Sequence, residues 1–306
     1  MKPQTLKRKV FFATLRLRFC GVKNTNMAKI LDAQKFYDEF KSSLKAQTRS
    51  LPVLTLASFS IGKNYSCQVY CASQKKLADE LGVKYLSIEL AEGTPLKEII
   101  TRIKDLNNDK KITGIVANKP FPSNVSEEEI FSAIDYKKDI EGMNPYNLGL
   151  LFIGEPLFIS PTVLSVLEFI KMTGVKLYGK DVTIIGFSTL IGKPLALILG
   201  RKFATVNITH IATFESKRLP FYVKNADIII SAVGIPNLIK GAWLKKGSIA
   251  IDVGIGRKNS KTVGDVELKK AIAKVSYITP VPGGVGKLTS LFLFKNLIDA
   301  HQKYAK

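Results

Sequence analysis

The stretch that most constrains this chain spans residues 181–200 and reads DVTIIGFSTLIGKPLALILG. Its apolar run at 182–185 is typical of a central parallel strand, which is buried on both faces, rather than of an alternating surface strand. Gly186 permits a sharp turn after the strand, and Gly192 lets the following helix approach the strand closely. Ser188 adds a hydroxyl near the free N–H groups of that helix. Together these features could hold a cofactor pyrophosphate.

Two common nucleotide-binding motifs do not match this turn. The triphosphate-binding motif G-x-x-x-x-G-K-[ST] fails because five residues separate Gly186 from Gly192, and because Pro194 occupies the Ser/Thr position. The dinucleotide fingerprint G-x-G-x-x-G is incomplete, since Ser188 stands at its second glycine. A strand–loop–helix whose glycines serve packing alone is therefore the alternative interpretation.

Length and composition are those of a globular chain of about two domains. The chain has 306 residues, 46% of them hydrophobic, and no run of 18 apolar residues, so no transmembrane helix is expected. The three cysteines, Cys20, Cys67 and Cys71, indicate a reducing compartment. No standard zinc spacing combines them with the two histidines, His210 and His301, so no metal site is expected.

The chain is strongly basic, with 46 Lys and Arg, 25 Asp and Glu, and a net charge of +21. Such an excess raises a nucleic-acid hypothesis. The lysines are scattered, however, and the sequence has no aromatic-interleaved basic stripe and no helix-turn-helix pattern. Attraction of small anions is the simpler consequence, and we expect neither a nucleic-acid nor a membrane partner.

Residues 1–26 form an N-terminal extension with seven basic residues and no acidic one. Transit peptides share this composition, but the segment is poor in Ser and shows no clear cleavage site. We favour two alternatives: a disordered extension, or an upstream start codon with Met27 as the true first residue.

From Met27 onward, strand and helix patterns alternate, which predicts parallel sheets covered by helices. Strands are expected at 52–57, 83–90, 112–117, 182–185, 205–209, 227–231, 249–253 and 276–279. Helices are expected at 33–45, 67–81, 95–106, 127–134, 162–172, from about 191, and at 288–303. The fold class is therefore α/β, and the second unit is predicted to be Rossmann-like.

Ligands of such sheets bind at the carboxyl ends of the strands. NAD enzymes carry Asp or Glu about 20 residues beyond the glycine turn, where this chain has His210. Several basic residues surround this position in sequence: Lys193, Arg201, Lys202, Lys217 and Arg218. A positive, acid-free pocket suits the 2′-phosphate of NADP, and a solvated basic face is the alternative.

Six segments in order then carry a specific resemblance. They are CQVYCASQKK (67–76), IIGFSTLIGKP (184–194), ADIIISAVGIP (226–236), IDVGIGR (251–257), VGDV (263–266) and YITPVPGGVG (277–286). With these motifs, the chain resembles the bifunctional methylenetetrahydrofolate dehydrogenase/methenyltetrahydrofolate cyclohydrolase (FolD-type) family from about residue 27 to the last helix.

The resemblance implies two α/β domains with a cleft between them and a C-terminal helix that returns to the first domain. It implies a folate-binding catalytic domain at 27–150 plus 287–306 and a dinucleotide-binding domain at 151–286. The family oxidises 5,10-methylenetetrahydrofolate with NADP and hydrolyses the methenyl product to 10-formyltetrahydrofolate. Family members are typically cytoplasmic homodimers; import into an organelle through residues 1–26 is the alternative location.

Site residues follow from the matched positions. Those implied in catalysis are Tyr70, Gln74, Asn118 and Glu141. Those implied in cofactor binding are Gly186, Phe187, Ser188, Gly192 and Ile255. Those implied in substrate binding are Tyr70, Pro282, Gly283 and Gly284. From the pattern alone, a Tyr four residues before Gln74 on a helix is more often a packing residue than a catalytic one.

Three of these positions depart from the family pattern. Gln74 replaces a lysine, Asn118 a glutamine and Glu141 an aspartate. Phe187 and Ile211 also lack the family's usual contacts to a 2′-phosphate, which leaves NAD as the alternative to NADP.

The lysine replacement affects the two reactions differently. Hydride transfer depends mainly on positioning, whereas cyclohydrolysis needs a titratable group, and Gln74 cannot titrate. Lys75 points about 100° further round the helix, so a shifted replacement is not the default. We expect a dehydrogenase with weakened cyclohydrolase activity. The alternatives are a folate- or dinucleotide-binding protein without catalysis and, less favoured, a nucleic-acid binder.

Overall fold

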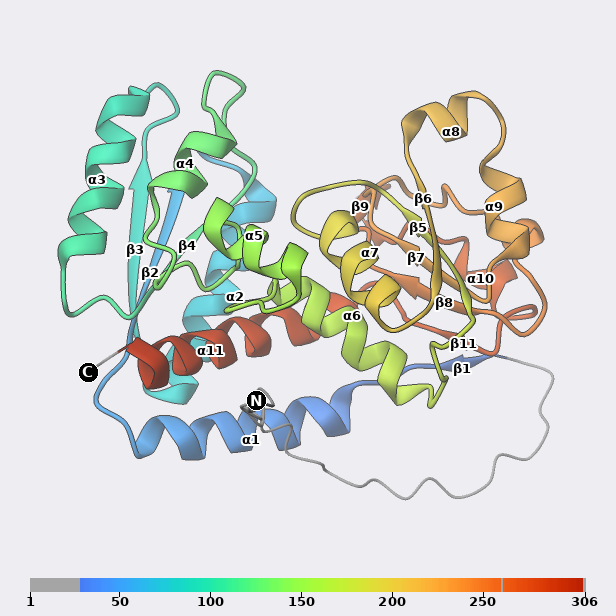
Figure 1. Cartoon of the computed structure of the whole chain (residues 1–306), viewed down its shortest axis with the longest axis horizontal. Helices are drawn as coiled ribbons and strands as arrows, with labels where there is room; N and C mark the ends of the chain where they lie inside the picture. The colour runs from blue at the N-terminus through green and yellow to red at the C-terminus, as the bar shows by residue number, and fades with distance from the viewer. Residues whose placement is uncertain (1–27, 260, 305–306) are drawn as a thin grey trace, which may run out of the picture.

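The computed structural model describes residues 28–259 and 261–304, which form two α/β domains side by side (Figure 1). The first domain contains a parallel three-stranded sheet in the order β3-β2-β4. Its strands are β2 (Thr55–Ile61), β3 (Lys84–Leu90) and β4 (Gly114–Ala117). The central strand β2 is buried along its whole length because it has a neighbour on each edge and helices over both faces.

The side chains of β2 alternate between two cores. The helices of this domain are α2 (Tyr65–Leu81), α3 (Leu96–Asn108) and α4 (Glu127–Ala133). Ala57 and Phe59 share a core with residues of α3 and α4. Leu56 shares the other core with Leu77 of α2. Ser58 therefore lies on the α2 side of the sheet, where it contributes to the site described below.

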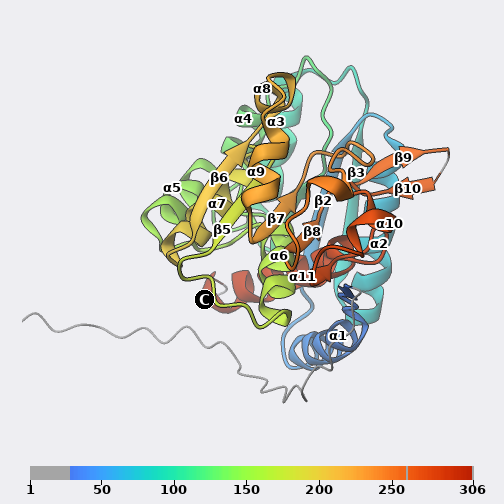
Figure 2. The same cartoon turned by 90° about the vertical axis from the view of Figure 1, so that its right-hand side faces the viewer.

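The second domain contains a six-stranded parallel sheet in the order β1-β11-β8-β7-β5-β6, as expected of a Rossmann-like unit. Its strands are β1 (Lys29–Ile30), β5 (Asp181–Ile185), β6 (Thr205–Thr209), β7 (Ile228–Ser231), β8 (Ile249–Asp252) and β11 (Tyr277–Ile278). Its helices include α6 (Pro161–Met172), α7 (Gly192–Arg201), α8 (Ile211–Glu215), α9 (Leu219–Asn225) and α10 (Leu268–Ala271), with a short 3₁₀ turn at Gly241–Trp243. A hairpin of β9 (Gly256–Lys258) and β10 (Lys261–Val263) projects from this domain (Figure 2).

The two ends of the described chain cross between the domains. β1 pairs with β11 in the second sheet. The C-terminal helix α11 (Val285–Tyr304) instead packs against α6 and α1 (Gln34–Arg49), beside the first domain (Figure 1). Asn296 of α11 donates hydrogen bonds to the carbonyls of Ile140 (2.7 Å) and Ile159 (2.9 Å), which fixes the helix on the chain between the domains. The predicted return of the C-terminal helix is confirmed.

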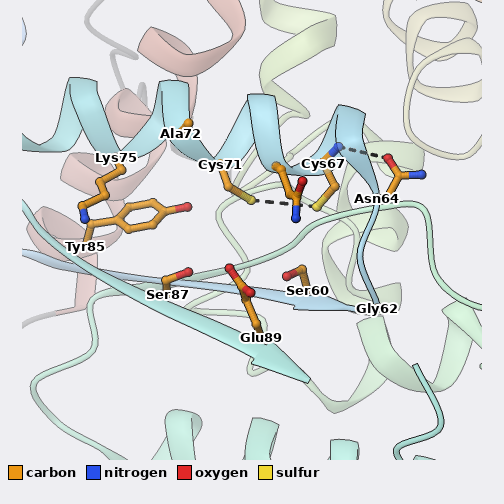
Figure 3. A pocket seen from close by; sticks show the side chains of 11 residues that line it. Ser60, Gly62, Asn64, Cys67, Cys71, Ala72, Lys75, Tyr85, Ser87 and Glu89 are labelled. Atoms are coloured by element: carbon orange, nitrogen blue, oxygen red, sulfur yellow. Dashed lines mark hydrogen bonds between the residues drawn. The ribbon is translucent and has the colours of Figure 1, made fainter. Parts of the chain in front are cut away.

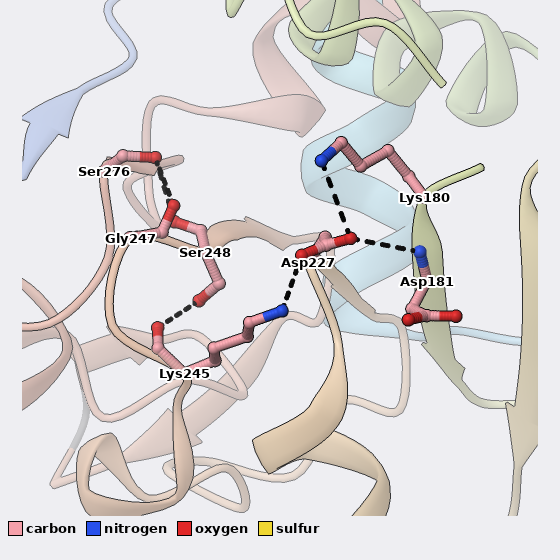
Figure 4. Close-up of polar contacts among 7 residues, drawn as sticks. All are labelled: Lys180, Asp181, Asp227, Lys245, Gly247, Ser248 and Ser276. Atoms are coloured by element: carbon pink, nitrogen blue, oxygen red, sulfur yellow. Dashed lines mark hydrogen bonds and ion pairs between the residues drawn. The ribbon is translucent and has the colours of Figure 1, made fainter. Parts of the chain in front are cut away.

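Asp227 ties together the amino ends of β5 and β7 (Figure 4). Its carboxylate accepts a hydrogen bond from the backbone N–H of Asp181 at 3.2 Å. The same carboxylate pairs with Lys245 at 2.7 Å and with Lys180 at 3.8 Å. This edge of the sheet is thus closed by structural contacts, while ligands of such sheets bind at the opposite, carboxyl edge.

One helix, α5 (Pro145–Ile153), was not among the helices expected from the sequence. The side chain of Asn144 caps it by accepting the N–H of Tyr146 at 2.8 Å, and Pro145 occupies its first position. Elsewhere the predicted strands and helices are present, with shifts mainly at their ends: β2 begins at residue 55 rather than 52, and α11 at 285 rather than 288. The extension 1–26 lies outside the described residues, and the exact domain boundaries remain a prediction.

Candidate active site

Helix α2 carries two of the predicted catalytic residues toward the end of β4. The side chain of Asn64 caps the helix by accepting the backbone N–H of Cys67 at 3.1 Å. Gly82 ends it in a left-handed conformation with φ +72°. Between these caps, Tyr70 and Gln74 lie one turn apart. Asn118 follows directly after β4, so the fold brings it against Gln74 from another strand.

Gln74 is fully buried in a closed set of hydrogen bonds. Its Nε2 donates to Asn118 Oδ1 at 3.2 Å, and its Oε1 accepts from Ser58 Oγ at 3.3 Å and from the Tyr85 hydroxyl at 3.1 Å. Asn118 Nδ2 donates in turn to Ser58 Oγ at 2.7 Å. We call Gln74, Asn118, Ser58 and Tyr85 the amide network. All four side chains are neutral.

Tyr70 and Glu141 lie beside this network. Burial raises the pKa of Tyr70 above its usual range, and the nearby Glu141 adds to the rise, while a hydrogen bond with Gln74 opposes it. Burial raises the pKa of Glu141 to about 8; Asp139 adds to the rise, while the backbone at Ala117 opposes it. Tyr70 therefore stays protonated at neutral pH, and Glu141 is close to half-ionised at weakly alkaline pH.

Lys75 does not take the place of the family's lysine. It lines a pocket of about 380 Å³ between α2 and strands β2 and β3, together with Tyr85 (Figure 3). Cys67 and Cys71 line the same pocket, with 3.9 Å between their sulfur atoms. Burial raises the pKa of Cys67 to about 12, so this thiol stays protonated.

On the cofactor side, two glycines are required by the backbone itself. A Cβ on Gly192 would lie 2.1 Å from the carbonyl oxygen of Gly186. Gly186 has φ +110°, and a Cβ there would meet the carbonyl oxygen of Ala232 at 2.7 Å. Ser188 Oγ accepts the N–H of Ile191 at 3.2 Å, which fixes the loop at the start of α7. The glycines hold strand, loop and helix in the close arrangement that a pyrophosphate site needs.

Apolar side chains surround this loop at the carboxyl ends of the strands. Phe187, Val233, Ile235 and Ile255 are exposed there, with 50% of Phe187 and 64% of Ile255 accessible to solvent. The Lys193 ammonium lies 5.1 Å from the centre of the Phe187 ring. Exposed apolar groups next to a glycine loop suit the flat rings of a dinucleotide.

A pair of buried carboxylates supports the same edge. Asp265 Oδ2 accepts the Ser231 hydroxyl and the N–H of Val233, both at 2.8 Å. Asp252 accepts the N–H groups of Asp265 (3.0 Å) and Val266 (2.8 Å). Burial raises the pKa of Asp252 to about 7. The sequence placed both aspartates in motifs but did not reveal that they join the ends of β7 and β8.

The loop that leads into α11 completes the site. Pro282 and Gly283 are exposed, and Gly283 has φ +98°. Gly284 packs so closely that a Cβ would lie 2.3 Å from the carbonyl oxygen of Pro280. Across the two domains, the Arg257 guanidinium lies 4.7 Å from the centre of the Tyr65 ring at the start of α2. The carboxyl edges of the two sheets therefore face each other.

In a comparison with known proteins, models of one family match both domains of this chain. Residues 31–141 match the family model "Tetrahydrofolate dehydrogenase/cyclohydrolase, catalytic domain", and residues 160–305 match its "NAD(P)-binding domain". This chain belongs to the FolD family. The bifunctional FolD protein of Acetivibrio thermocellus is 38% identical over 284 residues, which cover 91% of this chain and 99% of that one. The FolD protein of Geotalea daltonii is 38% identical over 282 residues, covering 90% and 100%.

Solved FolD structures have the same fold. The bifunctional enzyme of Campylobacter jejuni matches with a TM-score of 0.85 and 36% identity, covering 90% of this chain and 99% of that one. The Trypanosoma brucei enzyme, solved with NADP and an inhibitor, matches with a TM-score of 0.86 and 30% identity, covering 92% and 99%. The family and the NAD(P)-binding domain expected from the sequence are both confirmed.

One part of the sequence-based interpretation of this FolD chain is wrong. Arg201 and Lys202 lie at the far end of α7, which runs back from the carboxyl edge, so they do not contribute to a positive pocket at His210. Arg201 packs instead beside Gly154. At the end of β6, the exposed residues are His210 and Ile211.

The structure brings Tyr70, Gln74, Asn118 and Glu141 together; their catalytic roles remain predictions. Sequence reasoning missed Ser58 and Tyr85, whose only signal was their position on the strand face that points to α2. Among the residues described, no helix is long and apolar enough to cross a membrane, and no three His, Cys, Asp or Glu side chains cluster as metal ligands would.

Proposed function

We propose that this FolD protein oxidises 5,10-methylenetetrahydrofolate to 5,10-methenyltetrahydrofolate with NADP, and that its hydrolysis of the methenyl product to 10-formyltetrahydrofolate is weakened. The observation that carries the proposal is Gln74. It occupies the family's lysine position, and its amide hydrogen-bonds to the neutral side chains of Ser58, Asn118 and Tyr85. The site can position a folate but has lost an amine that could exchange protons.

The dehydrogenase half depends on groups that this chain keeps. NADP, when bound, supplies the acceptor for the hydride. The glycine loop, with Ser188 at its helix, places the pyrophosphate, and the exposed apolar rim excludes water from the rings. Ionised Glu141 can accept hydrogen bonds from the amino edge of the pterin. No acid is needed for hydride loss, so positioning supplies most of the catalysis.

The hydrolase half needs protons to move when water attacks. A positioned acid or base contributes about 10²–10⁴-fold to such a step. Gln74 and Asn118 do not titrate, and burial keeps Tyr70 and Tyr85 protonated. Glu141 is the titratable carboxyl group beside Tyr70, and no hydrogen bond joins it to Gln74 or Asn118.

Two domain assignments belong to this proposal. We assign the folate-binding catalytic domain to 27–150 with 287–306 and the dinucleotide-binding domain to 151–286. The packing of α11 supports the first assignment, and the six-stranded sheet supports the second.

We also expect a homodimer, to be measured by light scattering, and a cytoplasmic location. Phe187 and Ile211 offer a 2′-phosphate no charge, so NAD is the cofactor to test beside NADP.

The test is an absorbance assay with 5,10-methylenetetrahydrofolate that follows NADPH and the methenyl product together. We expect NADPH to form while the methenyl product accumulates. Rapid loss of the methenyl absorbance, at a rate matching NADPH formation, would contradict the weakened hydrolase. Folate and dinucleotide binding without reduction of NADP or NAD would favour the alternative, a binding protein without catalysis.

A further inference from the structure

Each hydrogen bond of the amide network has only one possible donor and one possible acceptor. A single backbone carbonyl, that of Phe59, fixes these assignments. Asn118 Nδ2 donates to the carbonyl oxygen of Phe59 at 3.1 Å. That oxygen can only accept, so the amide of Asn118 has one allowed orientation. Asn118 Oδ1 therefore points at Gln74 and needs a donor, which must be Gln74 Nε2.

The same reasoning fixes the other half of the network. Because Gln74 Nε2 faces Asn118, Gln74 Oε1 faces Ser58 and Tyr85. Ser58 Oγ already accepts from Asn118 and so gives its proton to Gln74. The second lone pair of Gln74 Oε1 then needs another donor, and the Tyr85 hydroxyl supplies it. Tyr85 reaches this point from β3, with its ring beneath α2 (Figure 3).

We propose that Tyr85 is a positioning residue that holds the Gln74 amide with its N–H groups toward Asn118 and Tyr70. Tyr70 then accepts a hydrogen bond from Gln74 and keeps its own O–H free to donate to a bound folate. Without Tyr85, Ser58 alone holds Gln74 Oε1, and the amide can rotate away from Tyr70. The inference rests on the proposed function, since it concerns how the folate is held.

A further consequence concerns the neighbouring lysine. Tyr85 lines the same pocket as Lys75, while its hydroxyl reaches Gln74 Oε1. The side chain that orients the neutral amide is therefore also part of the wall around the neighbouring lysine.

A double-mutant cycle tests the positioning role, because it separates the hydrogen bond from the packing of the ring. Tyr85→Phe removes only the hydroxyl. In the wild-type background we expect it to lower kcat/KM for NADPH formation by about three- to ten-fold, the size of one neutral hydrogen bond. In the Gln74→Met background, where no amide remains to orient, we expect Tyr85→Phe to change the rate less than about two-fold.

Three controls make the outcome decisive. Ser87→Ala, two residues along the same face of β3, should leave the rate unchanged. Calorimetric binding of a tetrahydrofolate provides the same cycle without turnover, and thermal unfolding shows that each variant is folded. Equal losses from Tyr85→Phe in both backgrounds, or no loss in either, would overturn the positioning role while leaving the proposed function intact. Wild-type protein that neither forms NADPH nor binds folate would overturn both.

Discussion

The two walls of the cleft hold their ligands by different means. On the cofactor wall, Gly186 and Gly192 are required because any side chain would collide with backbone atoms. On the folate wall, the amide network depends on which side-chain atoms donate and which accept. A backbone requirement tolerates no substitution, whereas a hydrogen-bond network can be rebuilt from other residues. The comparison explains how the cofactor wall can keep its two loop glycines while the folate wall changes three of the family's polar residues.

The strongest test of the comparison is to return the amine to the folate wall. Gln74→Lys should raise the rate of methenyl hydrolysis by about 10²-fold, because a buried lysine with a lowered pKa can exchange protons near neutral pH. Asn118 Oδ1, Ser58 Oγ and the Tyr85 oxygen can all accept from the ammonium. The decay of methenyl absorbance measures the rate of this hydrolysis. Gln74→Met is the control; an equal gain there would show that the amine is irrelevant.

On the cofactor wall, Gly192→Ala should destabilise the protein by about 1–3 kcal/mol and weaken NADP binding, because its Cβ would lie 2.1 Å from a carbonyl oxygen. Thermal unfolding and calorimetry measure the two effects. Gly200→Ala near the other end of α7 is the matched control, since a Cβ there meets nothing within 4 Å. Equal changes in stability and in NADP affinity for the two variants would show that the close approach of α7 to Gly186 does not matter.

A pH profile of NADPH formation tests the folate wall separately from the cofactor wall. Since the pKa of Glu141 is raised to about 8, kcat/KM for NADPH formation should rise about ten-fold between pH 7 and 9, as the carboxylate that holds the pterin ionises. Glu141→Gln should flatten this rise. The raised pKa also means that the stability contributed by protonated Glu141 is lost as pH rises from its unfolded value toward 8. A wild-type profile that is flat across this range would remove Glu141 from substrate binding.

The smallest effect is expected at Ser188. Ser188→Ala leaves the N–H of Ile191 without its side-chain acceptor, and we expect NADP to bind about two- to ten-fold more weakly. Ser216→Ala, a hydroxyl at the end of α8, serves as control. An unchanged dissociation constant for Ser188→Ala would show that backbone geometry alone holds the cofactor loop.

The sequence predicted those parts of the molecule that depend on local pattern. The apolar run before Gly186 and the glycine spacing after it are readable because strand burial and the helix approach act within a few residues of each other. The helix α5 escaped prediction although Asn144 and Pro145 form a recognisable start, because the surrounding polar turn residues favoured a loop.

The folate wall was only half predictable. Tyr70 and Gln74 share a helix, so their proximity follows from spacing. Ser58 and Asn118, by contrast, are 60 residues apart in sequence and meet only because β2 and β4 pair. Tyr85 approaches from a third strand, and nothing in its local sequence says that its hydroxyl ends at an amide on α2. Such contacts depend on strand order, which a single sequence does not specify.

The crossing of β1 and α11 bears on how this protein is made. Leu297 of α11 packs directly on β4, where a Cβ on Gly114 would lie 2.7 Å from it, and β1 is held by β11. The first sheet is thus synthesised early but sealed by a helix made much later. During translation, the apolar surface of β4 that α11 covers therefore stays exposed until α11 has emerged from the ribosome.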